Sequence, residues 1–127
     1  MQNWTLKPCD DINRMLKLRS DLENIDKASF PMLITLIHRY ATADDLLFPE
    51  ATTLAFFSDF EQKCAMQLDD AHMVAQDIDT GLLTIYIYAK NYQKSIEDTI
   101  AYLKLQPRYH VEFKVQEDKE WSVFKEL

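Results

Sequence analysis

The clearest pattern of hydrophobic positions runs from Leu82 to Ala89, a stretch without a charged residue. Successive side chains of a strand point to opposite faces of its sheet. One alternate set here is aliphatic: Leu83, Ile85, Ile87 and Ala89. The other set carries aromatic and hydroxyl groups beside one leucine: Leu82, Thr84, Tyr86 and Tyr88. Because both sets suit burial, the pattern predicts an interior strand of a sheet.

A second interior strand is predicted from Phe30 to Tyr40, where both alternate sets are mainly apolar as far as Ile37. Further strands are predicted at residues 4–6, 14–19 and 71–78, the last of which a turn joins to Leu82. A final strand at residues 109–116 alternates cleanly. Its apolar set, which we expect beneath the helices, consists of Tyr109, Val111, Phe113 and Val115.

Two segments have the spacing of three and four residues that is typical of an amphipathic helix. From Glu50 to Leu68 the apolar stripe consists of Leu54, Phe57, Phe60, Cys64 and Leu68. The second helix can be capped by Asn91 and ends before Pro107. Its stripe consists of Tyr92, Ile96, Ile100 and Leu103. Residues 117–127 are predicted to form a short helix or an extended tail that packs on the domain.

From Phe30 onward the elements follow the order strand, helix, strand, strand, helix, strand. This order predicts an α+β fold of the ferredoxin-like, split βαβ type, an antiparallel sheet with two helices on one face. The two interior strands would lie at its centre. We expect a single domain over residues 1–127, with the ferredoxin-like core at 30–116 and the tail at 117–127. The strand pair within residues 1–29 either extends an edge of the sheet or covers its other face.

The sheet face opposite the helices is predicted to carry Thr84, Tyr86 and Tyr88, with His110 and Glu112 from the last strand. An exposed aromatic patch often marks a surface for a protein partner. We therefore take Tyr86, Tyr88, His110 and Glu112 as candidate partner-binding residues. Packing of the two tyrosines beneath the N-terminal strand pair or the tail is an equally good explanation.

The formal net charge of the 127-residue chain is −7 at pH 7. Negative charge repels nucleic-acid phosphates and anionic lipid, so we expect neither as a partner and expect instead a protein with a basic surface. No apolar stretch is long enough to span a membrane, and the N-terminus lacks the pattern of a signal peptide. The only cysteines, Cys9 and Cys64, do not form a disulfide framework. Together these features predict a cytoplasmic protein.

The sequence contains none of the standard catalytic or phosphate-binding motifs. Three histidines occur without the short spacing of metal ligands: His38, His72 and His110. Adjacent carboxylates occur in predicted turns and at a helix end: Asp10–Asp11, Asp44–Asp45 and Asp69–Asp70. Solvated turn residues explain these pairs, and Cys64 has the position of a core thiol. We therefore expect no metal, no cofactor and no enzymatic activity.

The chain closes with a strand, an acidic turn and the motif Asp118-x-x-Trp121-x-x-Phe124. This ending resembles that of a bacterial family catalogued as domain of unknown function 695, and Trp4 matches an early tryptophan often seen there. The family often has tyrosine where this chain has Phe124. The resemblance implies a ferredoxin-like α+β domain without an established function. It extends distantly to acidic bacterial proteins that inhibit a ribonuclease by binding it, and related small acidic proteins occur as immunity proteins beside toxins.

We therefore predict a non-catalytic binding protein or inhibitor that docks an acidic surface onto a basic partner, such as a toxin domain or a ribonuclease. Two alternatives stay open. In the first, the chain is an enzyme or a small-ligand-binding domain with a site near Tyr86, Tyr88, His38 or His110. In the second, the open sheet face is the interface of a homodimer.

Overall fold

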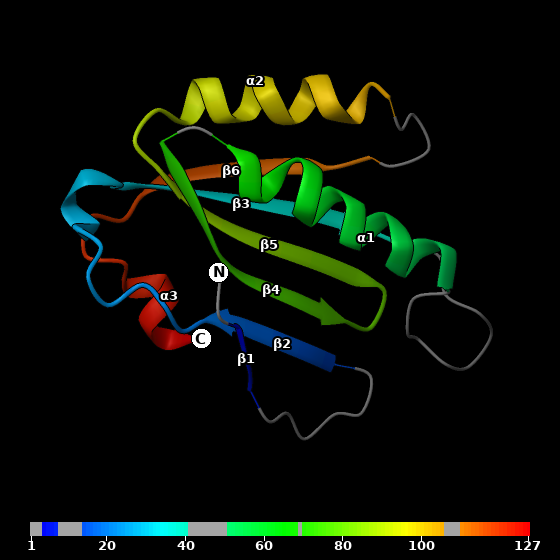
Figure 1. Ribbon diagram of the computed structural model, residues 1–127, viewed down its shortest axis with the longest axis horizontal. Coiled ribbons are helices and arrows are strands. Elements are labelled where there is room, and N and C mark those ends of the chain that lie inside the picture. The colour runs from blue at the N-terminus through cyan, green and yellow to red at the C-terminus, as the bar shows by residue number, and fades with distance from the viewer. Residues whose placement is uncertain (1–3, 8–13, 41–50, 69, 106–109) are drawn as a thin grey trace.

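The protein has an α+β fold built on one six-stranded antiparallel sheet, as predicted (Figure 1). The computed structural model describes residues 4–7, 14–40, 51–68, 70–105 and 110–127. The strands are β1 (Trp4–Lys7), β2 (Arg14–Arg19), β3 (Met32–Arg39), β4 (Ala71–Asp79), β5 (Leu82–Ala89) and β6 (Glu112–Glu117). Across the sheet their order is β1-β2-β4-β5-β3-β6.

The helices are α1 (Ala51–Lys63), α2 (Tyr92–Leu103) and α3 (Ser122–Glu126). Two short 3₁₀ turns, η1 (Lys27–Ser29) and η3 (Ala65–Gln67), complete the regular structure. Helix α1 ends earlier than predicted because the backbone leaves the helical conformation at Cys64 and enters η3. Helix α2 begins as predicted, since the Asn91 side chain accepts a hydrogen bond from the Lys94 backbone N–H at 3.3 Å.

The two most apolar strands, β3 and β5, lie side by side in the interior of the sheet. They pair along their whole length, from Met32 opposite Ala89 to Arg39 opposite Leu82. The N-terminal strands extend the sheet, because β2 pairs with β4 and β1 pairs with β2. This pairing settles the alternative between edge extension and coverage of the second face.

The main core lies between the sheet and helices α1 and α2, which cover one face together (Figure 1). The aliphatic set of β5 points into this core, where Ile85 is 1% exposed. A β-bulge between Met73 and Ala75 interrupts the alternation of β4. As a result Val74 and Ala75 both belong to the core on the second face, while Met73 belongs to the main core.

The predicted apolar stripe of α2 is wrong at Ile100, which is 40% exposed. The buried positions of α2 are instead Ser95 and Thr99. Tyr102, on the same side of α2, meets Phe60 of α1 edge-on with ring centroids 5.7 Å apart. The other three residues of the stripe pack against the main core, and Ile100 lies on the flank of α2 that points away from Tyr102.

The last strand also departs from its prediction. It begins at Glu112 rather than at Tyr109, which lies outside the described residues. Phe113 packs against the main core, but Val115 is 36% exposed. The physical reason is position, because among the described strands β6 lies at the edge and pairs only with β3.

Helix α1 buries two side chains that the predicted stripe omits, Phe56 and Glu61. The Glu61 carboxylate accepts hydrogen bonds from Lys17 Nζ at 2.9 and 3.0 Å. The same ammonium group lies 4.8 Å from the centroid of the Trp4 ring. A buried carboxylate needs such partners, so Lys17 on β2 explains why α1 can turn Glu61 toward the sheet.

We expect Ile85→Ala to lower the free energy of unfolding by about 2–5 kcal/mol, because it leaves a cavity in the main core. Thr84→Ala is the matched control, since its half-buried side chain lies one position away on the second face. Urea denaturation followed by circular dichroism measures both changes. A loss below about 1 kcal/mol for Ile85→Ala would contradict the assignment of the two faces.

Candidate functional site

The face of the sheet opposite α1 and α2 is divided into a covered half and an open half. The covered half is centred on Tyr88, which is fully buried. Residues 22–30 and the C-terminal segment, residues 118–127, supply its cover. The Tyr88 ring stacks on Trp121 with centroids 4.2 Å apart and an interplanar angle of 13°. Phe124 meets the Trp121 ring edge-on at 5.9 Å.

Asp118 holds the C-terminal segment in place through several hydrogen bonds. The Tyr88 hydroxyl donates to Asp118 Oδ2 at 2.6 Å. The backbone N–H groups of Ser122 and Val123 donate to the same carboxylate at 2.9 and 3.0 Å. Asp118 therefore accepts hydrogen bonds both from the first residues of α3 and from Tyr88 on the sheet. Hydrogen bonds to a charged acceptor are stronger than those between neutral groups.

Trp121 adds a further connection to the chain that precedes β3. Its indole N–H donates to the Phe30 carbonyl at 3.0 Å, and the Asp118 backbone N–H donates to the Pro31 carbonyl at 2.7 Å. To reach this position Trp121 adopts a left-handed backbone conformation with φ of 57°. This conformation is uncommon for a residue with a large side chain, so the surrounding contacts must stabilise it.

The predicted aromatic patch is therefore wrong for Tyr88, which no partner can contact in this conformation. The alternative explanation, packing beneath the tail, describes Tyr88 correctly. The motif residues Asp118, Trp121 and Phe124 provide that packing. Tyr86 lies on the same face of β5 but is only half-buried.

We call the open half of this face the open half-face. The pairing of the strands arranges its side chains in rows that run across the sheet. One row places Lys114, Thr35 and Tyr86 opposite one another on β6, β3 and β5. The next row runs across four strands: Glu112, Ile37, Thr84 and Asp77. All of these side chains are half-buried or exposed. The open half-face thus has Tyr86 and Ile37 near its middle and charged groups on its two sides.

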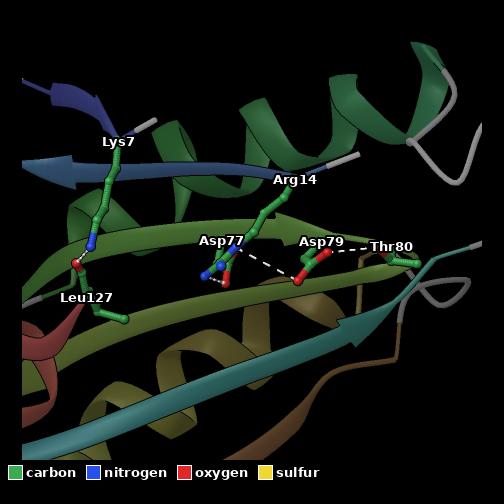
Figure 2. A network of polar contacts seen from close by, with 6 residues as sticks. All are labelled: Lys7, Arg14, Asp77, Asp79, Thr80 and Leu127. Atoms are coloured by element: carbon green, nitrogen blue, oxygen red, sulfur yellow. Dashed lines mark hydrogen bonds and ion pairs between the residues drawn. The ribbon is translucent and has the colours of Figure 1, made fainter. Parts of the chain in front are cut away.

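The β2 side of the open half-face carries a bidentate ion pair (Figure 2). Arg14 Nε and one terminal nitrogen donate to the two Asp77 oxygens at 3.2 and 3.1 Å. Arg14 also lies 3.8 Å from an Asp79 oxygen, and the Thr80 hydroxyl donates to the other Asp79 oxygen at 2.8 Å. This geometry holds Arg14 against the sheet rather than letting it extend into solvent.

Lys7 makes the remaining contact drawn in Figure 2, with its ammonium group donating to the backbone oxygen of Leu127. Strand β1 is therefore connected to the C-terminal segment that covers Tyr88. Two segments at opposite ends of the sequence thus meet beside the second face of the sheet.

The Tyr86 hydroxyl is a neutral donor at physiological pH. Burial raises the pKa of Tyr86, the Asp77 carboxylate raises it further, and Arg14 opposes both effects. A neutral phenol can donate and accept hydrogen bonds while its ring offers an apolar surface. These are the properties of a recognition residue at an interface.

The remaining sequence candidates do not gather at one site. His38 is buried on the helix side, where its Nδ1 lies 2.7 Å from the His110 carbonyl oxygen. His110 is exposed, and Glu112 is exposed on the open half-face opposite Ile37. His72 lies at the start of β4, edge-on to Phe30 with ring centroids 4.5 Å apart. The structure therefore groups Tyr86 and Glu112 on one surface and separates Tyr88 and His38 from it.

Cys64 lies in the main core, where burial raises the pKa of its thiol to about 11. The thiol is therefore protonated and unreactive at neutral pH. Within the described ranges, no group of three or more His, Cys, Asp or Glu side chains could hold a metal ion. The paired carboxylates Asp10–Asp11 and Asp44–Asp45, as well as Asp69 and Cys9, lie outside the described residues.

Sequence reasoning missed four residues of the open half-face and its β2 side: Arg14, Thr35, Ile37 and Asp77. Ile37 was visible as an apolar residue on an interior strand but carried no sign of exposure. Arg14 and Asp77 are far apart in the sequence and meet only through the pairing of β2 with β4. Alternation within each strand could have placed these side chains on a face, but it could not have joined them.

One family model matches residues 2–127, that of a family of unknown function, DUF695. No curated protein matches the chain, and no solved structure does. No helix in the described part of the chain is long and apolar enough to cross a membrane.

The Asp118 network predicts a specific dependence of stability on pH. Burial alone would raise the pKa of Asp118, but the hydrogen bonds from Tyr88, Val123 and Ser122 outweigh it and lower the pKa from its ordinary value. A carboxyl with a lowered pKa in the folded state stabilises the protein above its unfolded pKa. This contribution disappears as the pH falls through the folded pKa.

We therefore expect Asp118→Asn to destabilise the protein by about 1–2 kcal/mol at pH 7, and the difference from the wild type to shrink below about pH 4. Chemical denaturation at a series of pH values measures this difference. Glu120→Gln is the control, since it removes an exposed carboxylate from the same turn. A difference for Asp118→Asn that is unchanged at low pH would contradict the role of its charge.

Proposed function

The chain belongs to the family of unknown function DUF695, and from this premise we propose that it is a non-catalytic binding protein whose open half-face docks a protein partner. The observation that carries the proposal is the different burial of two tyrosines on one face of β5. The C-terminal segment buries Tyr88 completely but leaves Tyr86 half-buried beside Ile37. An aromatic residue among apolar and hydroxyl neighbours, with charges around it, has the anatomy of a protein interface.

The charge of the chain supports a partner with a basic surface. The net charge is −7, although the open half-face itself carries both signs, with Arg14 and Lys114 beside Asp77 and Glu112. The contact would therefore rely on Tyr86 and Ile37, with complementary ion pairs around them. The field of the whole protein would accelerate the approach of a cationic partner, which makes the association rate sensitive to salt.

Within this proposal the partner is a toxin domain or a ribonuclease, and the chain acts as its stoichiometric inhibitor or immunity protein. Both of these partner classes are compatible with an acidic binding protein, because enzymes that act on nucleic acid carry basic surfaces. We place the protein in the cytoplasm, which suits the buried, unpaired thiol of Cys64. The genes beside that of this chain would distinguish the two classes, since a toxin gene would favour immunity.

We expect Tyr86→Ala to weaken partner binding by about 2 kcal/mol or more, the loss typical of a central interface tyrosine. The experiment is affinity capture from the native host by the immobilised protein at low and high salt, with mass spectrometry of the retained proteins. Tyr92→Ala is the matched control, since it removes the same side chain from α2 on the helix side.

A true partner binds the wild type and Tyr92→Ala, is lost from Tyr86→Ala, and elutes as the salt concentration rises. Equal retention by the wild type and by Tyr86→Ala would contradict docking on the open half-face. Failure to recover a partner at low salt would count against a binding function altogether.

A further inference from the structure

The outer edge of β6 has the features of a second interface, which borders the open half-face at Glu112 and Lys114. In the described part of the sheet β6 pairs with β3 alone, so its other side presents backbone N–H and C=O groups without a neighbouring strand. An edge of this kind is a template for pairing with another strand. Six residues, Glu112–Glu117, are regular strand, which is the ordinary length of a paired strand.

One exposed apolar side chain, Val115, lies on this edge strand. Four large apolar residues of the described chain stand out as exposed: Leu6, Ile100, Leu105 and Val115. Three of them belong to α2, to the residues directly after it, and to β6. On α2, each residue advances about 100° around the axis, so Ile100 lies about 160° from Tyr102. Ile96 and Leu103 lie between these two directions and pack against the main core.

The direction of this flank follows from the neighbours of α2. Tyr102 contacts Phe60 of α1, so the Ser95 side of α2 faces α1. Helix α2 lies over the β3 and β6 side of the sheet (Figure 1). Ile100, on the side of α2 away from Tyr102, therefore points away from α1 and toward the β6 side of the sheet. An exposed apolar strip beside a free strand edge is the arrangement that strand pairing would cover.

We propose that β6 pairs in an antiparallel manner with β6 of a second copy of this chain, about a two-fold axis at Phe113. Residues directly opposite each other in an antiparallel pair point to the same face, so a register that preserves the faces centres on a residue. With Phe113 at the centre, Phe113 meets its own equivalent. Val111, the residue just before β6, then lies opposite Val115 of the second copy, so the three central residues on the helix side of the new pair are all apolar.

The charges of Glu112 and Lys114 favour this register over the adjacent registers. On the other face, Glu112 lies opposite Lys114 of the second copy, and symmetry repeats the pair. The next registers in either direction that preserve the faces place Lys114 opposite Lys114 or Glu112 opposite Glu112. Opposite charges across a strand pair stabilise it, and like charges destabilise it. Both side chains are exposed and therefore able to meet a second copy.

The symmetry of this pairing joins the two sheets into one and keeps both helix layers on the same side. The Ile100 flanks of the two α2 helices then approach each other above the new strand pair. The open half-faces lie together on the opposite side, where Tyr86 of each copy stays accessible. The proposed dimer therefore does not depend on the proposed partner, and either can be correct without the other.

Sedimentation equilibrium across the micromolar range measures the dimer affinity of the wild type and of variants in which the charges of β6 are reversed. The wild type is expected to form dimers. Lys114→Glu and Glu112→Lys should each weaken the dimer about tenfold or more, because two symmetric attractive pairs become repulsive. The double variant, with both substitutions, restores opposite charges and should regain the affinity of the wild type. Circular dichroism checks that each variant, altered only at exposed positions, is folded.

A wild type that is monomeric throughout the micromolar range would overturn the proposal. Dimers that neither single substitution weakens would show that the copies associate elsewhere. A double variant that fails to recover would exclude the register centred on Phe113. Ile100→Ser offers a second measurement, since it should weaken the dimer without altering a charge on the strand edge.

Discussion

The contact between Tyr88, Asp118 and Trp121 is the interaction on which the second face of the sheet depends. It joins an interior strand to the last residues of the chain by ring stacking and a 2.6 Å hydrogen bond to a carboxylate. Stacking of this kind adds about 0.5–1.5 kcal/mol to the burial of the rings, and a charged acceptor strengthens the bond further. Because the segment fastened in this way covers only the Tyr88 end of the face, the Tyr86 end is left open. The position of the candidate site follows from where this contact lies.

On the helix side the equivalent constraint is the main core that α1 and α2 form with the sheet. The buried positions of α2 are the small residues Ser95 and Thr99, while Ile100 lies on the exposed flank of this helix. The sheet is thus well covered over its interior strands and poorly covered at β6, where Val115 is exposed. The open half-face and the exposed edge of β6 have one cause. On each face of the sheet, the segments that pack against it are narrower than the sheet itself.

Much of the fold could be predicted because each strand carries its own pattern. The bounds of β2 and β5 agree with the alternation of their side chains, and the α+β class follows from the order of elements. The predictions were wrong where a contact with a distant segment overrides the local pattern of side chains. The bulge at Met73 and Ala75 shifts the alternation of β4, and Lys17 permits Glu61 to be buried on α1. Neither effect can be inferred from a single segment, because each depends on a contact distant in the sequence.

By itself the sequence determined which side chains share a face, since alternation in a strand is a local property of the backbone. It placed Tyr86 and Tyr88 together on the face opposite the aliphatic set, and it identified Asp118, Trp121 and Phe124 as a motif. Only the tertiary structure decided that the motif covers Tyr88 and not Tyr86, or that Arg14 meets Asp77. Exposure depends on which distant segment packs against a face, and that choice is made by the folded chain as a whole.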